Sequence, residues 1–374
     1  MEQVTHYRPT TAHINLQAIQ ANIKSLRQYI QPHVEVIAVV KANAYGHGDV
    51  QVAEAAIEAG ATMLAVATAD EAVKMRQSFH DVPILVLGAT PISFIPYAAT
   101  NHITLTVFSE QWVKLAQQEW TDLSNPVKLH IKIDSGMGRI GVTSKEQLQQ
   151  LYTAIIEAPQ FVIDGIFTHF ATADEQDTLY FDKQVYIFQE LLAALPEKPR
   201  MVHIANTATA LTKDWKLQYD AVRFGISMYG LLPSAYVGEI LPFPIEPAFS
   251  LVTELVHVKK INKGQSVGYG ATFKATEDCY VGTLPIGYAD GLIRKLSGQS
   301  VLIDGKKAPI VGRICMDQCM ILLPAAYNVG EPVVLIGEQQ GAKITFDDWA
   351  TKVETINYEL PCIITARVPR IYIK

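Results

Sequence analysis

One stretch near the N-terminus decides the fold prediction: Val34-Glu-Val-Ile-Ala-Val-Val40, with Lys41 directly after it. Every residue in it except Glu35 is apolar, and a short apolar run rich in β-branched residues is typical of a strand buried on both faces. Helical patterns flank the run at Leu16–Ile30 and Val50–Ala59. This alternation of helix and strand predicts parallel strands joined by right-handed crossovers.

The alternation continues over the first two-thirds of the chain. About eight strand–helix units in about 230 residues are typical of a (β/α)8 barrel, and an open doubly wound sheet is the alternative. Ser144 is expected to cap a helix over Lys145–Glu157, with Gln147 at the capping-box spacing. The further strands are expected at Met63–Ala67, Ile84–Leu87, Ile103–Val107, Val127–Ile133, Val162–Phe167, Met201–Ala205 and Val222–Ile226.

The pattern changes after Tyr229, where prolines crowd a stretch that resembles a linker. We expect a barrel domain over residues 1–243, whose first strand (about residues 1–13) can instead join the second domain, and a mainly β domain over residues 244–374. A short helix is expected from Thr345 to Val353. The β-type runs are Ser250–Lys259, Cys279–Leu284, Val301–Ile303, Ile310–Gly312, Met320–Leu323 and Val333–Ile336.

Composition narrows the class of protein. The 374 residues carry a net charge of −6, from 31 basic and 37 acidic side chains. The sequence contains no block of basic residues, which argues against partners such as nucleic acid or an anionic membrane. The N-terminus lacks a signal-peptide pattern, no apolar run suits a membrane span, and the four cysteines are unevenly spaced. These features favour a cytoplasmic location.

Lys41 is the first candidate for chemistry. Barrel active sites lie at the C-terminal ends of the strands, where a lysine is partly desolvated. Desolvation lowers an amine pKa from its ordinary value of about 10.4, and a neutral amine can attack an aldehyde. The alternative is a lysine that merely reaches the surface at a strand end.

A polar strand is the second candidate. Lys128, His130, Lys132 and Asp134 alternate with apolar residues, so they are expected to face the barrel lumen. An exposed edge strand is the alternative. Further polar residues stand at later strand ends: His169, His203, Asn206, Thr207 and Arg223.

Two other motifs carry less weight. Gly136-Met-Gly-Arg-Ile-Gly141 matches the dinucleotide fingerprint, which keeps a nicotinamide or flavin dehydrogenase as a competing class, but it lies mid-chain. Cys315 and Cys319 lack a second ligand pair, so no metal site is expected.

Three segments resemble motifs of the alanine racemase family: Lys41-Ala-Asn-Ala-Tyr-Gly-His-Gly48, Val267-Gly-Tyr-Gly-Ala-Thr-Phe273 and Gly312-Arg-Ile-Cys-Met-Asp-Gln318. The resemblance covers nearly the whole chain in order. It implies pyridoxal 5'-phosphate on Lys41 and two catalytic bases, Lys41 for the D-isomer and Tyr269 for the L-isomer. The other cofactor contacts that it implies are Tyr45, His169, Asn206, Thr207, Arg223, Gly225, Ile226 and Tyr358.

The resemblance also assigns the substrate side. Arg139, Met316 and Asp317 are implied to bind substrate, and Lys132 matches a residue that is often carbamylated in the family. Arg223 matches the donor to the cofactor's pyridine nitrogen. An arginine cannot accept a proton back, so the ring remains a weaker electron sink, which favours racemisation over transamination.

The implied function is interconversion of L- and D-alanine, supplying D-alanine for peptidoglycan. A homodimer with shared active sites is implied, in which Tyr269, Met316 and Asp317 serve the neighbouring subunit's site. The alternatives are a broader-specificity racemase, for example for serine, a decarboxylase of similar architecture, and a non-catalytic protein that binds pyridoxal phosphate.

Overall fold

The computed structural model describes residues 6–374, so the first five residues of the expected N-terminal strand lie outside it. The chain divides into two compact units. We call Ala18–Ala44 with Asp49–Glu246 the barrel unit. We call the residues up to Gln17, Tyr45–Gly48 and Pro247–Lys374 the β unit.

The strands of the barrel unit form a nearly closed parallel barrel. Within the described residues the sheet has eight strands, in the order β8-β7-β6-β5-β4-β3-β2-β9. The backbone N–H groups of Asp220 and Arg223 donate to the carbonyls of Val202 and Ala205, at 3.0 and 2.9 Å, and so join the two ends of the sheet. This confirms the barrel over the open sheet. The strands are β2 (Glu35–Val39), β3 (Met63–Val66), β4 (Ile84–Val86), β5 (Ile103–Val107), β6 (Val127–Lys132), β7 (Phe161–Phe167), β8 (Met201–His203) and β9 (Ala221–Phe224).

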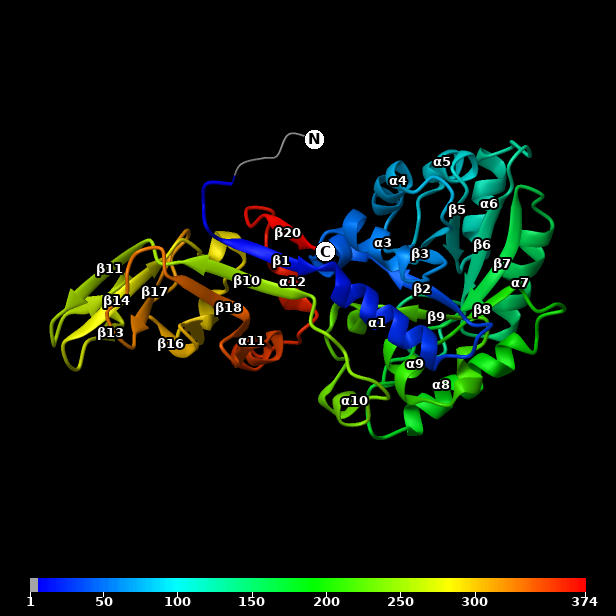
Figure 1. The fold of residues 1–374 in the computed structure, drawn as a ribbon. Helices are drawn as coiled ribbons and strands as arrows, with labels where there is room; N and C mark the ends of the chain where they lie inside the picture. The colour runs from blue at the N-terminus through cyan, green and yellow to red at the C-terminus, as the bar shows by residue number, and fades with distance from the viewer. Residues whose placement is uncertain (1–5) are drawn as a thin grey trace. The chain divides into compact units, whose positions relative to one another are not determined.

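Helices alternate with these strands along the chain and cover the barrel (Figure 1). The strands β3 and β4 are wholly apolar, as expected for strands buried on both faces, and β3, β4 and β5 have no exposed residue. No helix in residues 6–374 is long and apolar enough to cross a membrane. The helices are α1 (Leu16–Tyr29), α3 (Asp49–Glu58), α4 (Ala69–Ser78), α5 (Ile95–Thr100), α6 (Glu110–Glu119), α7 (Lys145–Ile156), α8 (Leu179–Leu192), α9 (Thr207–Thr212) and α10 (Ala235–Glu239).

The start of α7 forms half of its expected capping box. The Ser144 hydroxyl accepts from the N–H of Gln147 at 3.2 Å, as predicted. The Gln147 side-chain oxygen instead accepts from the N–H of Thr143 at 2.9 Å, one residue earlier than the motif requires.

The β unit is built on one large sheet. Within the described residues it has ten strands, and its path β11-β14-β17-β16-β15-β18-β10-β1-β20 carries β19 beside β18. Its N-terminal strand, β1 (Thr11–Asn15), pairs with β10 and β20. The others are β10 (Phe249–Glu254), β11 (His257–Ile261), β14 (Cys279–Leu284), β15 (Ser300–Ile303), β16 (Lys306–Val311), β17 (Cys319–Leu323), β18 (Pro332–Gln339), β19 (Ala342–Ile344) and β20 (Arg370–Ile373).

One predicted strand of this unit is wrong. The run Ser250–Lys259 is two strands, because the chain changes partner: β10 pairs with β18, whereas β11 pairs with β14. The N–H of Val256, between them, already donates to Thr283 at 3.0 Å. The smaller elements are β12 (Ser266–Val267), β13 (Phe273–Lys274), α11 (Phe346–Val353) and α12 (Glu359–Ile363).

Candidate active site

Lys41 stands directly beyond the C-terminal end of β2, on a turn of unusual hand. This turn, α2 (Lys41–Tyr45), is left-handed, with φ of 51–53° at Ala42, Asn43, Ala44 and Tyr45. The N–H of Ala44 donates to the carbonyl of Val40 at 2.9 Å. A left-handed conformation costs about 1–2 kcal/mol per non-glycine residue, so the surrounding structure must hold the lysine's turn in place.

Glu71 of α4 holds this turn. One carboxylate oxygen accepts from the N–H of Ala42 at 2.7 Å, and the other accepts from the N–H of Ala67 at 2.7 Å. Sequence reasoning missed Glu71. The signal was the spacing Thr68-x-x-Glu71, a capping box that the structure forms at the start of α4.

His169, just after β7, lies within a cluster of basic side chains. Burial lowers the pKa of its imidazole well below the ordinary range, and the charges of Arg223, Lys132, Arg139 and Lys41 lower it further. The Nη2 atom of Arg223 lies 3.4 Å from Nδ1 of His169. The barrel therefore brings these five predicted site residues together, and the cluster suits an anionic ligand.

Lys132 is a buried amine within this cluster. Its Nζ lies 4.4 Å from the centroid of the Phe167 ring. Burial, then the charges of Arg223 and Arg139, hold the pKa of Lys132 well below its ordinary value, and the opposing effect of Asp134 is smaller. The amine is therefore driven toward its neutral form.

The polar strand β6 is interior, since it pairs with β5 and β7. His130 and Lys132 are buried, as expected for lumen positions. Lys128 is a correction: its side chain is 61% exposed and reaches Asp164 at 4.0 Å. It lies near the N-terminal end of the strand, where a long side chain can extend into solvent.

The Gly136–Gly141 segment is not a dinucleotide-binding turn. The carboxylate of Asp134 accepts from the N–H groups of Gly136, Gly138 and Arg139, at 2.9, 3.0 and 3.0 Å. No helix starts in this described loop; α7 begins at Lys145. The loop instead presents Arg139 on a backbone shaped by one aspartate, and Arg139 itself is exposed.

The segments expected around a phosphate meet at the ends of β8 and β9. Asn206 caps α9 through the N–H of Thr209 at 3.0 Å. The Thr207 hydroxyl accepts from the N–H of Gly225 at 2.9 Å. Ile226 begins the next helical turn. These four residues, which the resemblance assigns to the cofactor, lie together at the ends of β8 and β9.

The β unit contains the two tyrosines assigned to the phosphate. The rings of Tyr45 and Tyr358 lie 6.4 Å apart between centroids. Burial raises the pKa of Tyr45, and the nearby Cys362 raises it further, so its hydroxyl remains a donor. Gly46 has φ +81°, and a Cβ there would lie 2.0 Å from the carbonyl oxygen of Pro361. Only glycine fits this close approach.

The remaining predicted residues of the β unit stand at its surface. Tyr269 is 69% exposed on the short turn between β12 and β13, and Met316 is 54% exposed. Asp317 accepts from Nη2 of Arg367 at 2.7 Å.

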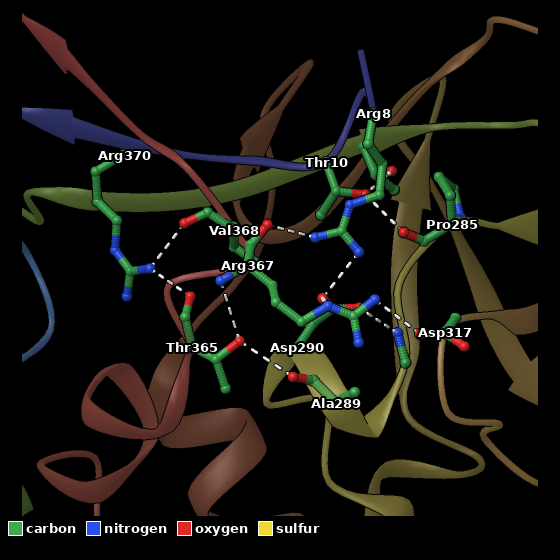
Figure 2. A network of polar contacts seen from close by, with 12 residues as sticks. Arg8, Thr10, Pro285, Ala289, Asp290, Asp317, Thr365, Arg367, Val368 and Arg370 are labelled. Carbon is green, nitrogen blue, oxygen red and sulfur yellow. Dashed lines mark hydrogen bonds and ion pairs between the residues drawn. The ribbon is translucent and has the colours of Figure 1, made fainter. Parts of the chain in front are cut away.

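A buried carboxylate organises the segment beside Met316. Asp290 accepts from Nη1 of Arg8 at 2.8 Å and from the N–H of Gly287 at 3.0 Å, and Nε of Arg367 lies 3.4 Å away (Figure 2). The N–H of Ala289 donates to the carbonyl of Met316 at 3.0 Å. Sequence reasoning did not assign Asp290 a role.

These features define a two-unit protein whose parallel barrel carries a lysine at a strand end. Residues 14–233 match the family described as alanine racemase, N-terminal domain, and residues 248–372 match its C-terminal domain. The chain is 53% identical to the alanine racemase of Anoxybacillus flavithermus over 370 residues, covering 98% of this chain and 96% of that one. Identity to the alanine racemase of Geobacillus stearothermophilus is 49% over 368 residues, covering 98% and 94%.

A solved structure shows the same likeness. The alanine racemase of Bacillus anthracis with bound L-Ala-P superposes with a TM-score of 0.96 at 45% identity, covering 99% of this chain and 96% of that chain. The chain therefore belongs to the alanine racemase family, and it is an enzyme of the isomerase class.

Proposed function

We propose that this enzyme interconverts L- and D-alanine with pyridoxal 5'-phosphate attached to Lys41. The observation that carries the proposal is the cluster of basic side chains around His169. Nη2 of Arg223 lies 3.4 Å from Nδ1 of His169, and Lys41, Lys132 and Arg139 lie near enough to lower the pKa of that imidazole. Pyridoxal phosphate carries an anionic phosphate and a phenolic oxygen, so a cluster of donors and positive charges fits it. When bound, the cofactor supplies an electron sink that acidifies the substrate Cα–H.

The chain's own residues then move the protons. Racemisation removes a proton from one face of Cα and delivers one to the other, which two bases on opposite faces accomplish. We assign Lys41 to the D-isomer and Tyr269 to the L-isomer by resemblance. Asn206, Thr207, Gly225, Ile226, Tyr45 and Tyr358 are assigned to the phosphate on the same ground.

Arg223 is assigned to the pyridine nitrogen. Burial, with a contribution from Arg139, lowers the pKa of Arg223 to about 9, so the guanidinium is still protonated at neutral pH. It can only donate to a ring nitrogen, which supports racemisation over chemistries that need a protonated ring.

Arg139, Met316 and Asp317 are assigned to the substrate, with Met316, Asp317 and Tyr269 supplied by the second subunit of a homodimer. A carbamate on Lys132 would hold Arg139 by charge. Supply of D-alanine for peptidoglycan and a cytoplasmic location stay predictions. The second candidate, a broader racemase that also accepts serine, shares these residues.

The lysine assignment is tested by substitution. Lys41→Ala should remove the visible absorbance of the cofactor-loaded protein and lower alanine racemisation by roughly 10²–10⁴-fold, the effect of losing a positioned base. Absorbance spectra and chiral chromatography over a panel of L-amino acids measure both, and the panel separates alanine from serine racemases. Lys114→Ala, at an exposed lysine on α6, is the control. A wild-type protein that stays colourless with cofactor would refute the proposal.

A further inference from the structure

A line of buried polar side chains runs from the N-terminal end of the barrel to Arg223. The Oδ2 atom of Asp164 lies 3.2 Å from Nε2 of His130. Nδ1 of His130 lies 2.8 Å from Nε2 of His203. Nδ1 of His203 lies 3.0 Å from Nη1 of Arg223. We call these four residues the relay.

The two ends of the relay determine where every proton sits. Asp164 is ionised, because Arg200 and His130 lower the pKa of its carboxyl against the effect of burial, so it can only accept. His130 must then carry its proton on Nε2 and accept at Nδ1. His203 must in turn carry its proton on Nε2 and accept at Nδ1 from the guanidinium. Each imidazole is neutral, in keeping with the lowered pKa values that burial gives both.

The backbone makes room for this arrangement. The pairing of β6 with β7 shifts register between Leu129 and His130, so that Asp164 is an extra residue in β7. Such a bulge redirects side chains, and both Asp164 and Gly165 border His130 as a result. A Cβ on Gly165 would lie 2.6–2.8 Å from three atoms of the His130 ring, so glycine is required for the ring to occupy this position.

Arg223 is a buried cation whose nearest partners carry no negative charge. It is only 4% exposed. Among the described residues, its hydrogen-bond partners are the carbonyls of Thr168, His203 and Ile204 and the two imidazoles of His169 and His203, with no carboxylate in contact. A buried charge is costly when no opposite charge lies beside it, even where it is hydrogen-bonded. The hydrogen bonds of the relay link Arg223 to one carboxylate, that of Asp164.

We propose that Asp164 is a positioning residue for Arg223, acting through His130 and His203: its negative charge polarises the two imidazoles and holds the guanidinium protonated and oriented toward the cofactor ring. The role toward the cofactor rests on the proposed function. The relay itself does not, because it concerns side chains of this chain alone.

The first test locates the ring protons of His130 and His203 directly and requires no measurement of enzyme activity. Nitrogen-15 NMR of histidine-labelled protein should show His130 and His203 each protonated at Nε2 and bare at Nδ1, with and without cofactor. An imidazolium, or a proton on Nδ1 of either ring, would overturn the relay. Because wild-type protein suffices, this test stands even where a variant fails to fold.

The second test removes the negative charge of Asp164 and keeps the shape of its side chain. Asp164→Asn should move the nitrogen signals of both imidazoles and lower kcat roughly tenfold, with KM within about twofold, as expected for a residue coupled to a site through others. Lys198→Gln is the control. It removes an ion pair with Asp220 at 3.0 Å, which involves no residue of the relay, and should keep kcat within about twofold.

The outcomes separate the possible roles. If both variants lose thermal stability alike and neither changes kcat, Asp164 is only structural and the proposal is wrong. If Asp164→Asn moves the His130 signals but not those of His203, the line is broken and the proposal is also wrong. A wild type that racemises no amino acid defeats the proposed function, while the NMR result still decides the relay.

Discussion

Lys132 shows how strongly a single residue depends on its surroundings. In sequence it is one of two lysines on an alternating strand, whereas in the barrel it is buried near Arg139 and Arg223, and its pKa lies well below the ordinary value. In the unfolded chain the amine keeps its proton up to about pH 10.4. The folded protein releases that proton at lower pH, so burial of Lys132 destabilises the fold most when both states are protonated.

This residue predicts a pH dependence of stability. Between the lowered pKa of folded Lys132 and about pH 10.4, the unfolded state binds more protons, so the free energy of unfolding rises with pH by up to about 1.4 kcal/mol per unit. Lys132→Met should flatten that rise, measured by urea unfolding between about pH 7 and about pH 10 in CO₂-free buffer. Lys114→Met, at an exposed lysine, should retain the wild-type slope. Parallel slopes in all three proteins would contradict the burial argument.

The Lys132→Met variant also tests whether Lys132 is carbamylated. Wild type incubated with ¹³C-bicarbonate should acquire a carbamate carbon signal that Lys132→Met lacks, because a neutral buried amine can react with CO₂. A signal that persists in the variant would place the modification elsewhere.

At the scale of elements, the turn of Tyr288–Asp290 depends on one carboxylate. Asp290 caps the turn through the N–H of Gly287 and pairs with Arg8 and Arg367, which come from opposite ends of the chain (Figure 2). Within this turn, the N–H of Ala289 donates to the carbonyl of Met316. A buried carboxylate with several donors stabilises more than an exposed ion pair does.

Asp290→Asn should therefore destabilise the protein by about 1–3 kcal/mol, the cost of losing charged hydrogen bonds in a buried place. It should also raise KM for alanine, since the Met316 segment loses support. Urea unfolding and steady-state kinetics measure the two effects. Lys306→Ala breaks an exposed pair with Asp304 and should shift stability by less than about 0.5 kcal/mol. Equal small effects of both substitutions would show that Asp290 does not organise the turn.

At the scale of the whole molecule, the β unit exposes two large side chains to which the resemblance assigns a place in the active site. Tyr269 and Met316 are both more than half exposed although they lie on the segments assigned to catalysis and substrate binding. Both side chains are therefore accessible to a second subunit. That they complete the site of a second subunit stays a prediction.

Mixed dimers test this prediction. Lys41→Ala and Tyr269→Ala proteins should each be nearly inactive alone. If every site takes Lys41 from one subunit and Tyr269 of the partner subunit, subunit exchange between the two variants gives half mixed dimers, each with one intact site. Activity should then recover to about one quarter of wild type. Exchange of wild type with the double variant is the control for dissociation. No recovery after verified exchange would mean that both residues act within one chain.

Local sequence predicted the barrel closely because its strands are buried on both faces, which leaves apolar runs that periodicity recognises. The strands β2 and β5 lie where those runs were read. Prediction from local sequence failed at Ser250–Lys259, because the change of pairing partner from β18 to β14 depends on strands distant in sequence. It also missed the left-handed turn after Lys41, since four successive non-glycine residues with positive φ contradict local preference.

The sequence by itself determined the barrel, the strand-end lysine and, through motifs, the membership of the family, because these depend on local periodicity and short-range order. Only the tertiary structure decided which charges meet. The cluster of basic side chains around His169 and the path from Asp164 to Arg223 join residues from separate strands. Barrel closure sets those distances, and with them the desolvation and pairing that determine each proton's place.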